Sequence, residues 1–259
     1  MIRALRGRLS AFSGWAVPVV LLLVWEALGW AGVLPARILP PPSRVLLAAW
    51  KLLESGQLVN DMAVSARRAL LGFALGGGLG FVLGVVNGLS STLSRLLDST
   101  LQMIRNIPHL ALIPLVILWF GIGEQGKLFL VAEGVLFPVY VNTYHGIRNV
   151  DSGLLEMGQV YGLSRWEVFR DIVLPGALPS ILVGVRYALG VMWLTLIVAE
   201  TIAASSGIGY ITMQAREFMQ TDVLVMGILL YAALGKLADT VARLLERQML
   251  RWHPAYQKA

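Results

Sequence analysis

Long apolar stretches alternate with short polar ones along most of this sequence. A helix that spans a bilayer needs about 20 mostly apolar residues. Six stretches approach that length, at 15–34, 69–89, 107–122, 128–147, 181–204 and 223–241. The third is short unless it extends back through Met103. The pattern therefore predicts an all-α, polytopic membrane bundle of about six transmembrane helices.

These stretches divide the chain into segments. We predict an N-terminal tail (1–14), a first transmembrane helix (15–34), an outer loop (35–68), a membrane core (69–245) that includes a polar loop (148–180), and a C-terminal tail (246–259). In the outer loop, Pro40, Pro41 and Pro42 cannot continue a helix. Ser43 is a candidate N-cap. Apolar residues then recur at helical spacing, which predicts an amphipathic helix at the outer face of the membrane. They are Val45, Leu46, Ala49, Leu52 and Leu53.

Glycines recur every four residues in the second stretch. They are Gly72, Gly76, Gly80, Gly84 and Gly88. At 3.6 residues per turn they form a nearly continuous stripe without side chains. Such a stripe lets another helix approach closely in lipid. The partner is either a helix of the same chain or a second subunit.

The composition supports a membrane protein. Of the 259 residues, 57% are hydrophobic and 14% are charged, whereas a soluble domain has about 25% charged residues. The chain has no cysteine, which excludes disulfides, Cys-ligated metal sites and a thiol nucleophile. We attribute the net charge of +6 to the positive-inside rule rather than to nucleic-acid binding.

Lys and Arg positions predict the orientation. With a cytoplasmic N-terminus, 12 of these residues fall inside and 7 outside, with Arg186 and Lys236 in spans. This bias favours both termini in the cytoplasm. A cleaved signal peptide is the alternative for the first stretch, because Arg3, Arg6 and Arg8 precede it. Its length and the late Glu26 favour an uncleaved span.

Residues 121–128 resemble a phosphate-binding loop only superficially. The segment has Leu128 where such a loop requires Ser or Thr, and it lies between two predicted spans. The three histidines, His109, His145 and His253, are scattered. We therefore expect no catalytic residues, no metal site and no cofactor bound by this chain.

Charged residues inside the spans are costly and should face protein or water, often in pairs. Lys236 and Asp239 can pair on one helix face, and Arg186 can snorkel to the cytoplasmic interface. Glu200 lies near the outer end of its span, where it would repel an anion. We expect a gating or structural role for Glu133 and Glu200.

The loop between the fourth and fifth stretches is rich in charge, with seven charged residues between 148 and 171. It also has helix signals. Ser164 and Glu167 form a capping box, and Gly162 ends a short helix before it. Pro175 then permits a turn into the fifth span. Four apolar side chains on the two short helices predict a docking surface. They are Leu155, Tyr161, Trp166 and Phe169.

This loop resembles the EAA loop of binding-protein-dependent ABC importer permeases. Glu156, Gly162, Ile172, Leu174 and Pro175 have the spacing E-x5-G-x9-I-x-L-P, although Met157 and Gly158 replace the two alanines. In that family the loop is a coupling helix that docks on the cytoplasmic ATPase. The resemblance implies this role for the loop. The residues are Glu156, Gly162, Leu163, Arg165, Ile172, Leu174 and Pro175.

The resemblance extends over most of the chain. Segments 105–108, 118–124, 137–143, 173–179 and 199–201 look like the nitrate, sulfonate and taurine branch, and 207–210 and 250–254 look closest to aliphatic sulfonate permeases. It implies a permease in the bacterial cytoplasmic membrane that works with a second permease copy, two ABC ATPase subunits and an extracytoplasmic solute-binding protein. ATP and magnesium would bind to the ATPase.

The expected substrate is a small anion, an alkanesulfonate first, with nitrate, taurine or another small solute as alternatives. An intramembrane enzyme or a self-sufficient channel would leave the loop unexplained. An anion needs hydrogen-bond donors along its path. Candidates at the start of the third span and within the fifth are Arg105, Asn106, His109, Trp193 and Thr195. His109 and Thr195 have an alternative role, in which they only satisfy helix backbone.

Overall fold

The computed structural model describes residues 2–253, in which all regular secondary structure is helical. The predicted all-α fold is confirmed. The helices are α1 (Ile2–Trp30), α2 (Pro42–Glu54), α3 (Gln57–Leu89), α4 (Ser91–Arg105), the 3-10 helix η1 (His109–Leu112), α5 (Ile113–Phe120), α6 (Glu124–Arg148), α7 (Ser152–Val160), α8 (Arg165–Val168), the π-helical turn η2 (Phe169–Val173), α9 (Leu174–Ala203), α10 (Ile208–Glu217) and α11 (Thr221–Met249). The end of the predicted C-terminal tail, 254–259, lies outside the described residues.

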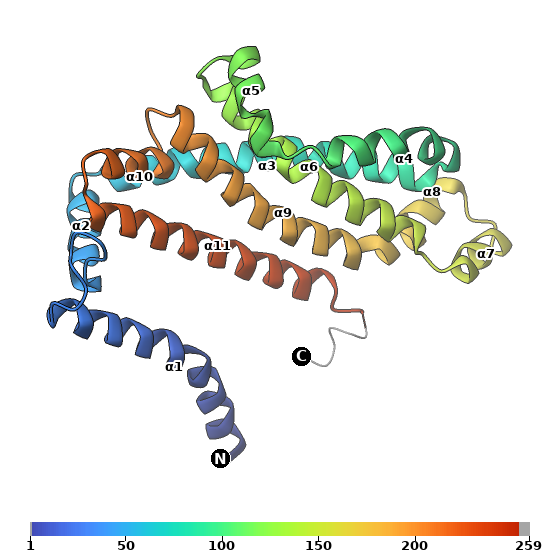
Figure 1. Ribbon diagram of the computed structural model, residues 1–259. Helices are drawn as coiled ribbons and strands as arrows, with labels where there is room; N and C mark the ends of the chain where they lie inside the picture. Colours follow the sequence, from blue (N-terminus) through green and yellow to red (C-terminus); the bar gives the residue numbers. More distant parts are fainter. Residues whose placement is uncertain (1, 254–259) are drawn as a thin grey trace.

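Four long helices, α3, α6, α9 and α11, lie side by side in the bundle (Figure 1). Helices α2 and α10 lie at one end of it, and α7 and α8 at the other. The α1 helix leaves the bundle and makes its main contact with α2. The α5 helix projects from the opposite side. The bundle therefore has two distinct ends, which carry different candidate sites.

Within the described residues, three helical segments are long and apolar enough to cross a membrane: Gln57–Leu89, Arg165–Ile202 and Thr221–Met249. A bent pair, Ser99–Arg105 with Leu110–Phe120, raises the number to four. The sequence predicted about six. The apolar part of α1 is shorter, at Ala16–Trp30, and α6 carries four charged residues among its 25. The lengths and compositions of the helices thus support fewer spans than the apolar stretches of the sequence suggested.

The predicted third span, 107–122, is not one helix. The chain bends by 79° between α4 and the segment that contains α5. Proline removes a backbone donor and disfavours helical geometry at the residue before it, so Pro108 separates α4 from η1. Residues up to Arg105 instead belong to α4, which Ser90 caps by accepting a hydrogen bond from the amide of Leu93.

The segment 35–68 differs from the prediction at its N-cap and is more helical than predicted. The N-cap of α2 is Pro41, because Pro42 occupies the first turn, where a missing N–H is tolerated. The amide of Ser43 instead donates to Glu26 of α1 at 2.9 Å. Helix α3 begins at Gln57, so Arg68 lies within a long helix.

The glycine stripe of α3 lies against α6. A Cβ atom on Gly76 or Gly80 would overlap the carbonyl oxygen of Ala132 or Leu136. Because packing rather than hydrophobicity drives helix association in lipid, this backbone approach holds the two helices together. Polar side chains continue the same interface, where Asn87 donates to the hydroxyl of Tyr140 at 2.7 Å.

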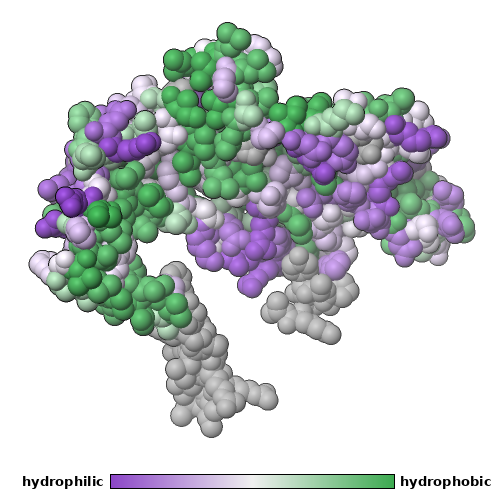
Figure 2. Space-filling model, viewed as in Figure 1, coloured by the Kyte–Doolittle hydropathy of each residue, from purple (hydrophilic) through white to green (hydrophobic). Residues whose placement is uncertain are grey.

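The core follows from this contact. Helix α9 packs on the α3–α6 pair through a cluster of buried apolar residues: Ala69, Val131, Val135, Val139, Ala188, Met192 and Leu196. The outer surface is apolar as well. Figure 2 shows apolar residues over α5 and over the coloured part of α1, and hydrophilic residues over the C-terminal half of α11. Large exposed apolar surfaces of this kind suit a protein that faces lipid or other subunits.

We expect Gly76→Ala to lower the free energy of unfolding by about 1–3 kcal/mol, because the added methyl group would force α3 away from α6. Gly78 is the matched control. It lies on the same helix, and no atom lies within 4 Å of the position that an added methyl group would take, so Gly78→Ala should leave stability unchanged or slightly higher. Thermal unfolding of the detergent-solubilised protein measures both. Equal melting temperatures would contradict the packing role of Gly76.

Candidate functional site

The first candidate site is the polar segment that contains α7 and α8. Asp151 caps α7 by accepting a hydrogen bond from the amide of Gly153 at 2.8 Å. Gly162 ends this helical segment with φ at +72°, a left-handed conformation that glycine adopts without strain. Ser164 and Glu167 then form the predicted capping box at the start of α8. The segment is therefore ordered by its own local hydrogen bonds.

One face of this segment packs on the bundle. Gly158 lies directly against Ile172, since a Cβ on Gly158 would lie 2.8 Å from Cδ1 of Ile172. Leu155 and Phe169 pack against a buried cluster around Val173. The sequence placed Leu155 and Phe169 on the docking surface, but the structure turns both toward the core.

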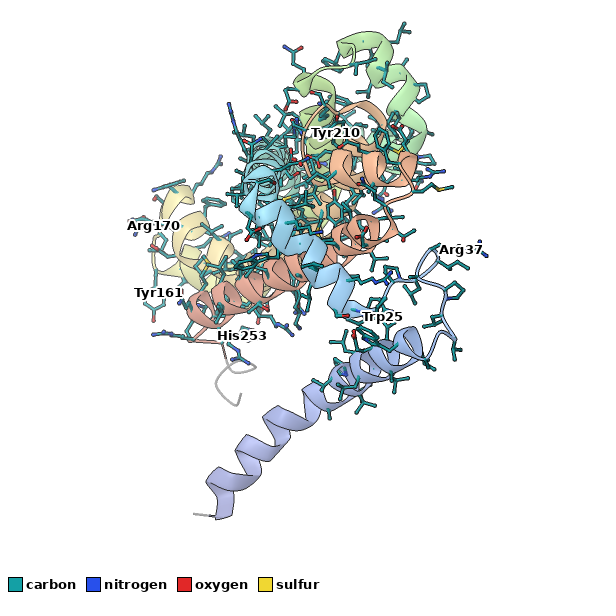
Figure 3. All side chains as sticks on the ribbon, turned by 90° about the vertical axis from the view of Figure 1, so that its left-hand side faces the viewer. Trp25, Arg37, Tyr161, Arg170, Tyr210 and His253 are labelled. Carbon is teal, nitrogen blue, oxygen red and sulfur yellow. The ribbon has the colours of Figure 1, made fainter. Side chains whose placement is uncertain are left out.

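The other face is exposed and apolar. Val160, Tyr161 and Trp166 are 86%, 77% and 64% exposed. Figure 3 shows Tyr161 and Arg170 at the edge of the molecule. The residues with the EAA spacing divide between the faces: Glu156, Gly162 and Arg165 are exposed, whereas Leu163, Ile172, Leu174 and Pro175 are half-buried. The segment thus combines an apolar face for a partner with a packed attachment to the bundle.

The attachment is continuous with a long helix. Helix α8, the π-helical turn η2 and α9 follow one another without a break, and Pro175 lies in the first turn of α9. The expected turn at Pro175 is therefore absent. The backbone stays helical through the π-helical turn and past Pro175, so Arg165–Ile202 is one helical segment.

The second candidate site is a cluster of charges at the opposite end, centred on Arg68. Its guanidinium donates from Nε and Nη2 to the two carboxylate oxygens of Glu124, at 2.7 and 2.6 Å. Its Nη1 donates to Glu200 at 2.8 Å and to the carbonyl of Ser206 at 2.6 Å. The Arg68 and Glu200 side chains are 4% and 0% exposed. A buried pair of charges is tolerable only with such complete hydrogen bonding.

The same cluster holds the start of α10. Glu200 accepts from the amide of Gly209 at 2.9 Å and from the hydroxyl of Ser65 at 2.8 Å. Ser65 in turn accepts from the amide of Ile208, and Asp61 accepts from the amide of Gly207. These oxygens satisfy amides that the first turn of a helix leaves unpaired. Helices α3, α6, α9 and α10 are therefore joined at one point.

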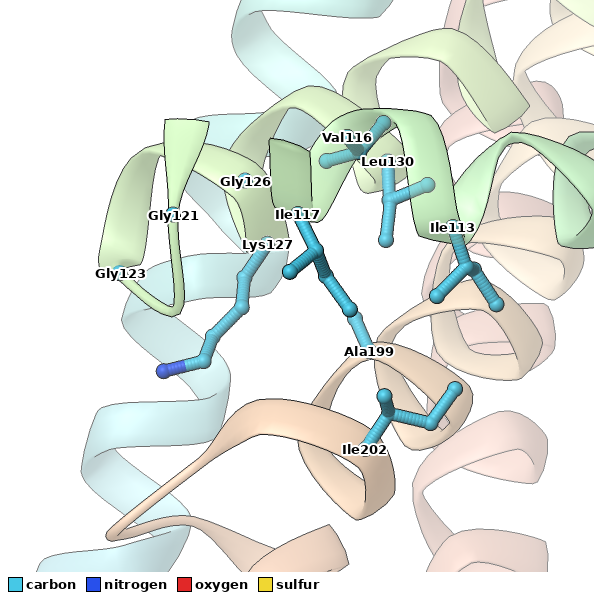
Figure 4. Close-up of a pocket in the computed structure, with 10 residues that line it drawn as sticks. All are labelled: Ile113, Val116, Ile117, Gly121, Gly123, Gly126, Lys127, Leu130, Ala199 and Ile202. Atoms are coloured by element: carbon cyan, nitrogen blue, oxygen red, sulfur yellow. The ribbon is translucent and has the colours of Figure 1, made fainter. Parts of the chain in front are cut away.

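Lys127 completes the cluster from α6. Its ammonium lies 3.0 Å from Glu124. Its aliphatic stem lines a small apolar cavity of about 20 Å³, shown in Figure 4 beside Ile117 and Ile202. Hydrogen bonds from Arg68, together with those from Lys127 and the charges of both cations, lower the pKa of Glu124 to about 2. Glu124 is therefore ionised at neutral pH.

The candidate path residues do not form one site. Arg105 and Asn106 are exposed at the C-terminal end of α4, and the side chain of His109 lies outside the described part. Thr195 is buried against Gly134 of α6, and Trp193 packs against the core of α3, α6 and α9. Glu133 is half-buried, with Oε2 buried and unpartnered among the described residues.

A separate groove of about 510 Å³, which contains none of the described candidate path residues, lies between α9 and α11. Arg186 lines it and pairs with Asp239 of α11 at 2.8 Å, rather than only snorkelling to the interface. Asp239 also lies 2.6 Å from Arg243 and 3.8 Å from Lys236. The predicted pairing of Lys236 with Asp239 is confirmed, as the longest of these contacts.

Sequence reasoning missed most of the Arg68 cluster. It singled out Glu200, but it placed Arg68 in a loop and gave Glu124 no partner. The available signal was an Arg and two Glu residues next to apolar stretches, where unpaired charges are costly. Arg68 is 56 residues from Glu124 and 132 residues from Glu200 in the sequence. Patterns among neighbouring residues cannot predict a pairing over such separations.

Comparison with known proteins relates the chain to a transport family. The sequence model of the family described as "Binding-protein-dependent transport system inner membrane component" matches residues 76–251. The chain is 63% identical over 242 residues to the "Putative aliphatic sulfonates transport permease protein SsuC" of Escherichia coli K12, covering 93% of this chain and 92% of that protein. It is 36% identical to the taurine transport system permease protein TauC of the same organism, over 92% of this chain and 88% of that protein.

Solved structures agree on the fold. A crystal structure of an amino acid ABC transporter superposes with a TM-score of 0.62 at 16% identity, over 77% of this chain and 97% of that chain. An inward-facing structure of the MetNI methionine ABC transporter gives 0.54 at 20% identity, over 76% and 96%. Both likenesses concern the fold alone. The family match, together with the identity to curated permeases along nearly the whole chain, shows that this protein belongs to the binding-protein-dependent ABC importer permeases.

Proposed function

We propose that this permease carries a small alkanesulfonate across the cytoplasmic membrane. The observation that carries the proposal is the 63% identity to the SsuC protein along 93% of the chain, against 36% to the taurine permease. The alternatives are nitrate, taurine or another small solute. Whichever of these solutes it carries, the substrate arrives on an extracytoplasmic solute-binding protein.

We further propose that the α7–α8 segment docks on a cytoplasmic ATPase. The exposed apolar side chains of Val160, Tyr161 and Trp166 support this role, because such residues are costly in water and favoured in interfaces. The continuous path from α8 into α9 supports a coupling function, since movement of the segment shifts a helix of the bundle. ATP and magnesium bind to the ATPase, which supplies the energy.

The complete transporter in this proposal contains two copies of this chain and two ATPase subunits. The α7–α8 end then lies in the cytoplasm with both termini, and α2 and α10 lie at the outer face. Nucleotide binding draws the ATPases together and switches the permease pair between inward-open and outward-open states. Such switching requires ligands that bind the two states with different affinity.

Of the two roles expected for Glu200, gating or structural, we assign the structural one. It ties the start of α10 to α3 and α9 at the outer end of the bundle. Because the carboxylate is fully buried and its partners are satisfied, it cannot also hold a substrate without giving up part of this network. We assign it to the stability of the outer end.

Cells that express this chain with its ATPase and binding protein should accumulate labelled ethanesulfonate and grow on it as the sole sulfur source. Excess unlabelled taurine or nitrate should compete weakly. An ATPase variant unable to hydrolyse ATP is the control and should abolish uptake. Flux through the purified permease without the ATPase would contradict the importer mechanism, and stronger competition by taurine would contradict the substrate assignment.

Gly162→Arg should abolish association with the ATPase while leaving the permease inserted, because a non-glycine residue at φ +72° strains the turn that places α7. Gly162→Asn is the matched control, since asparagine tolerates the left-handed region, and it should retain association. A pull-down from detergent extracts measures both. Full association of the Arg variant would count against the coupling assignment.

Glu200→Gln should lower the free energy of unfolding by about 1–3 kcal/mol, because one carboxylate that accepts from Arg68, Ser65 and Gly209 is replaced by an amide with a single accepting oxygen. Glu217, exposed on α10, is the control, and Glu217→Gln should change little. Thermal unfolding tests the pair. An unchanged melting temperature for Glu200→Gln would refute the structural role.

A further inference from the structure

Glu124 is a surface carboxylate held by two buried cations. Its side chain is 57% exposed, whereas those of Arg68 and Lys127 are 4% and 6% exposed. The fixed part of this arrangement is therefore cationic. The anion is the part that can turn away, because it lies in the first turn of α6 with more than half of its surface in solvent.

Three N–H groups converge on the position of this carboxylate. They are Nε and Nη2 of Arg68, at 2.7 and 2.6 Å, and Nζ of Lys127, at 3.0 Å. The remaining nitrogen of Arg68, Nη1, stays bound to Glu200 and to the carbonyl of Ser206. Rotation of Glu124 would leave Arg68 anchored and three charged donors directed at one place.

The charges define what such a place would bind. The basic residues Arg67, Arg68 and Lys127 balance the acidic residues Asp61, Glu124 and Glu200, so the resting cluster is formally neutral. Without Glu124 it would carry one net positive charge beside a half-buried surface. A buried cation that loses its partner is strongly destabilised unless another anion replaces it. The geometry and charge favour a single monovalent anion.

Space for that anion exists on both sides of Glu124. One cavity of about 280 Å³ is lined by Arg67, Arg68, Glu124 and Ser206. Another of about 470 Å³ is lined by Glu124, Lys127 and Ser205. Glu124 is common to both cavities. Since pockets for drug-sized ligands have about 300–1,000 Å³, a small organic anion fits either one.

We propose that this cluster is an anion-binding site at the outer end of the permease, and that the Glu124 carboxylate occupies it until a sulfonate headgroup displaces it. A sulfonate carries one negative charge and three terminal oxygens, which match the three converging N–H groups. Charge-assisted hydrogen bonds from arginine and lysine are the strong ones in proteins. This inference rests on the proposed sulfonate transport and extends it to named residues.

Because Glu124 is a tethered competitor for the same donors, the site binds its anion weakly enough to release it, as transport requires. If Glu124 occupies the cations most of the time, the apparent dissociation constant rises by the inverse of the vacant fraction. The site then receives an anion at high local concentration and releases it readily, because Glu124 returns. It also remains neutral when no substrate is present.

Isothermal titration of the full-length chain in phosphatidylcholine nanodiscs with sodium ethanesulfonate, at constant ionic strength and pH 7, tests this inference. Glu124→Ala and the size-conserving Glu124→Gln should each tighten binding at least about tenfold over the wild type, as expected if the site is vacant a tenth of the time or less. Adding Lys127→Gln to Glu124→Gln should remove the gain. Glu217→Ala, also exposed near the outer end, is the matched control and should change nothing.

Two further ligands define the chemistry. Ethyl methyl sulfone, a neutral analogue, should not bind, and chloride should bind more weakly than ethanesulfonate. Equal affinity in the wild type and both Glu124 variants, a gain that survives Lys127→Gln, or chloride binding as tight as that of ethanesulfonate would each overturn the inference. Ethanesulfonate uptake by cells with no Glu124-dependent change in binding would overturn it while leaving the proposed function intact.

Discussion

The close approach of α3 to α6 is the contact on which the rest of the bundle depends. In lipid there is no solvent to drive apolar helices together, so stability depends on how closely two backbones can fit. Gly76 and Gly80 bring α3 against carbonyl groups of α6, and α9 then packs on the pair. The polar contacts follow from this placement, because Arg68 reaches Glu124 only when the two helices are aligned.

The bundle therefore connects two chemically different ends. At one end α7 and α8 are ordered by their own caps and expose an apolar face. At the other end Arg68, Glu200 and Asp61 join α3 and α9 to the start of α10. Helix α9 extends from one end to the other, and the π-helical turn before it leaves the path unbroken. The two ends are therefore connected by one continuous helical segment, Arg165–Ile202.

Much of this could be predicted from the sequence because the signals are local. The capping box at Ser164, the left-handed Gly162 and the glycine period of α3 each follow from a few neighbouring residues. The bend at Pro108 and the early start of α3 were missed. An apolar stretch indicates which residues can be buried, but it does not indicate where the helix begins or bends. The charge cluster could not be predicted from the sequence for another reason. Arg68 meets Glu124 and Glu200 across 56 and 132 residues, and only the packing of three helices brings them together.

That separation has a consequence for biosynthesis. The chain is made from its N-terminus, so Arg68 is synthesised before either of its carboxylates. Glu124 follows first and can neutralise Arg68 as soon as the α3–α6 pair forms. Glu200 and the amides of α10 come much later and add the remaining hydrogen bonds. The order of the three residues along the chain thus gives the arginine an early partner during membrane insertion, and this end of the bundle is completed only after α10 has been made.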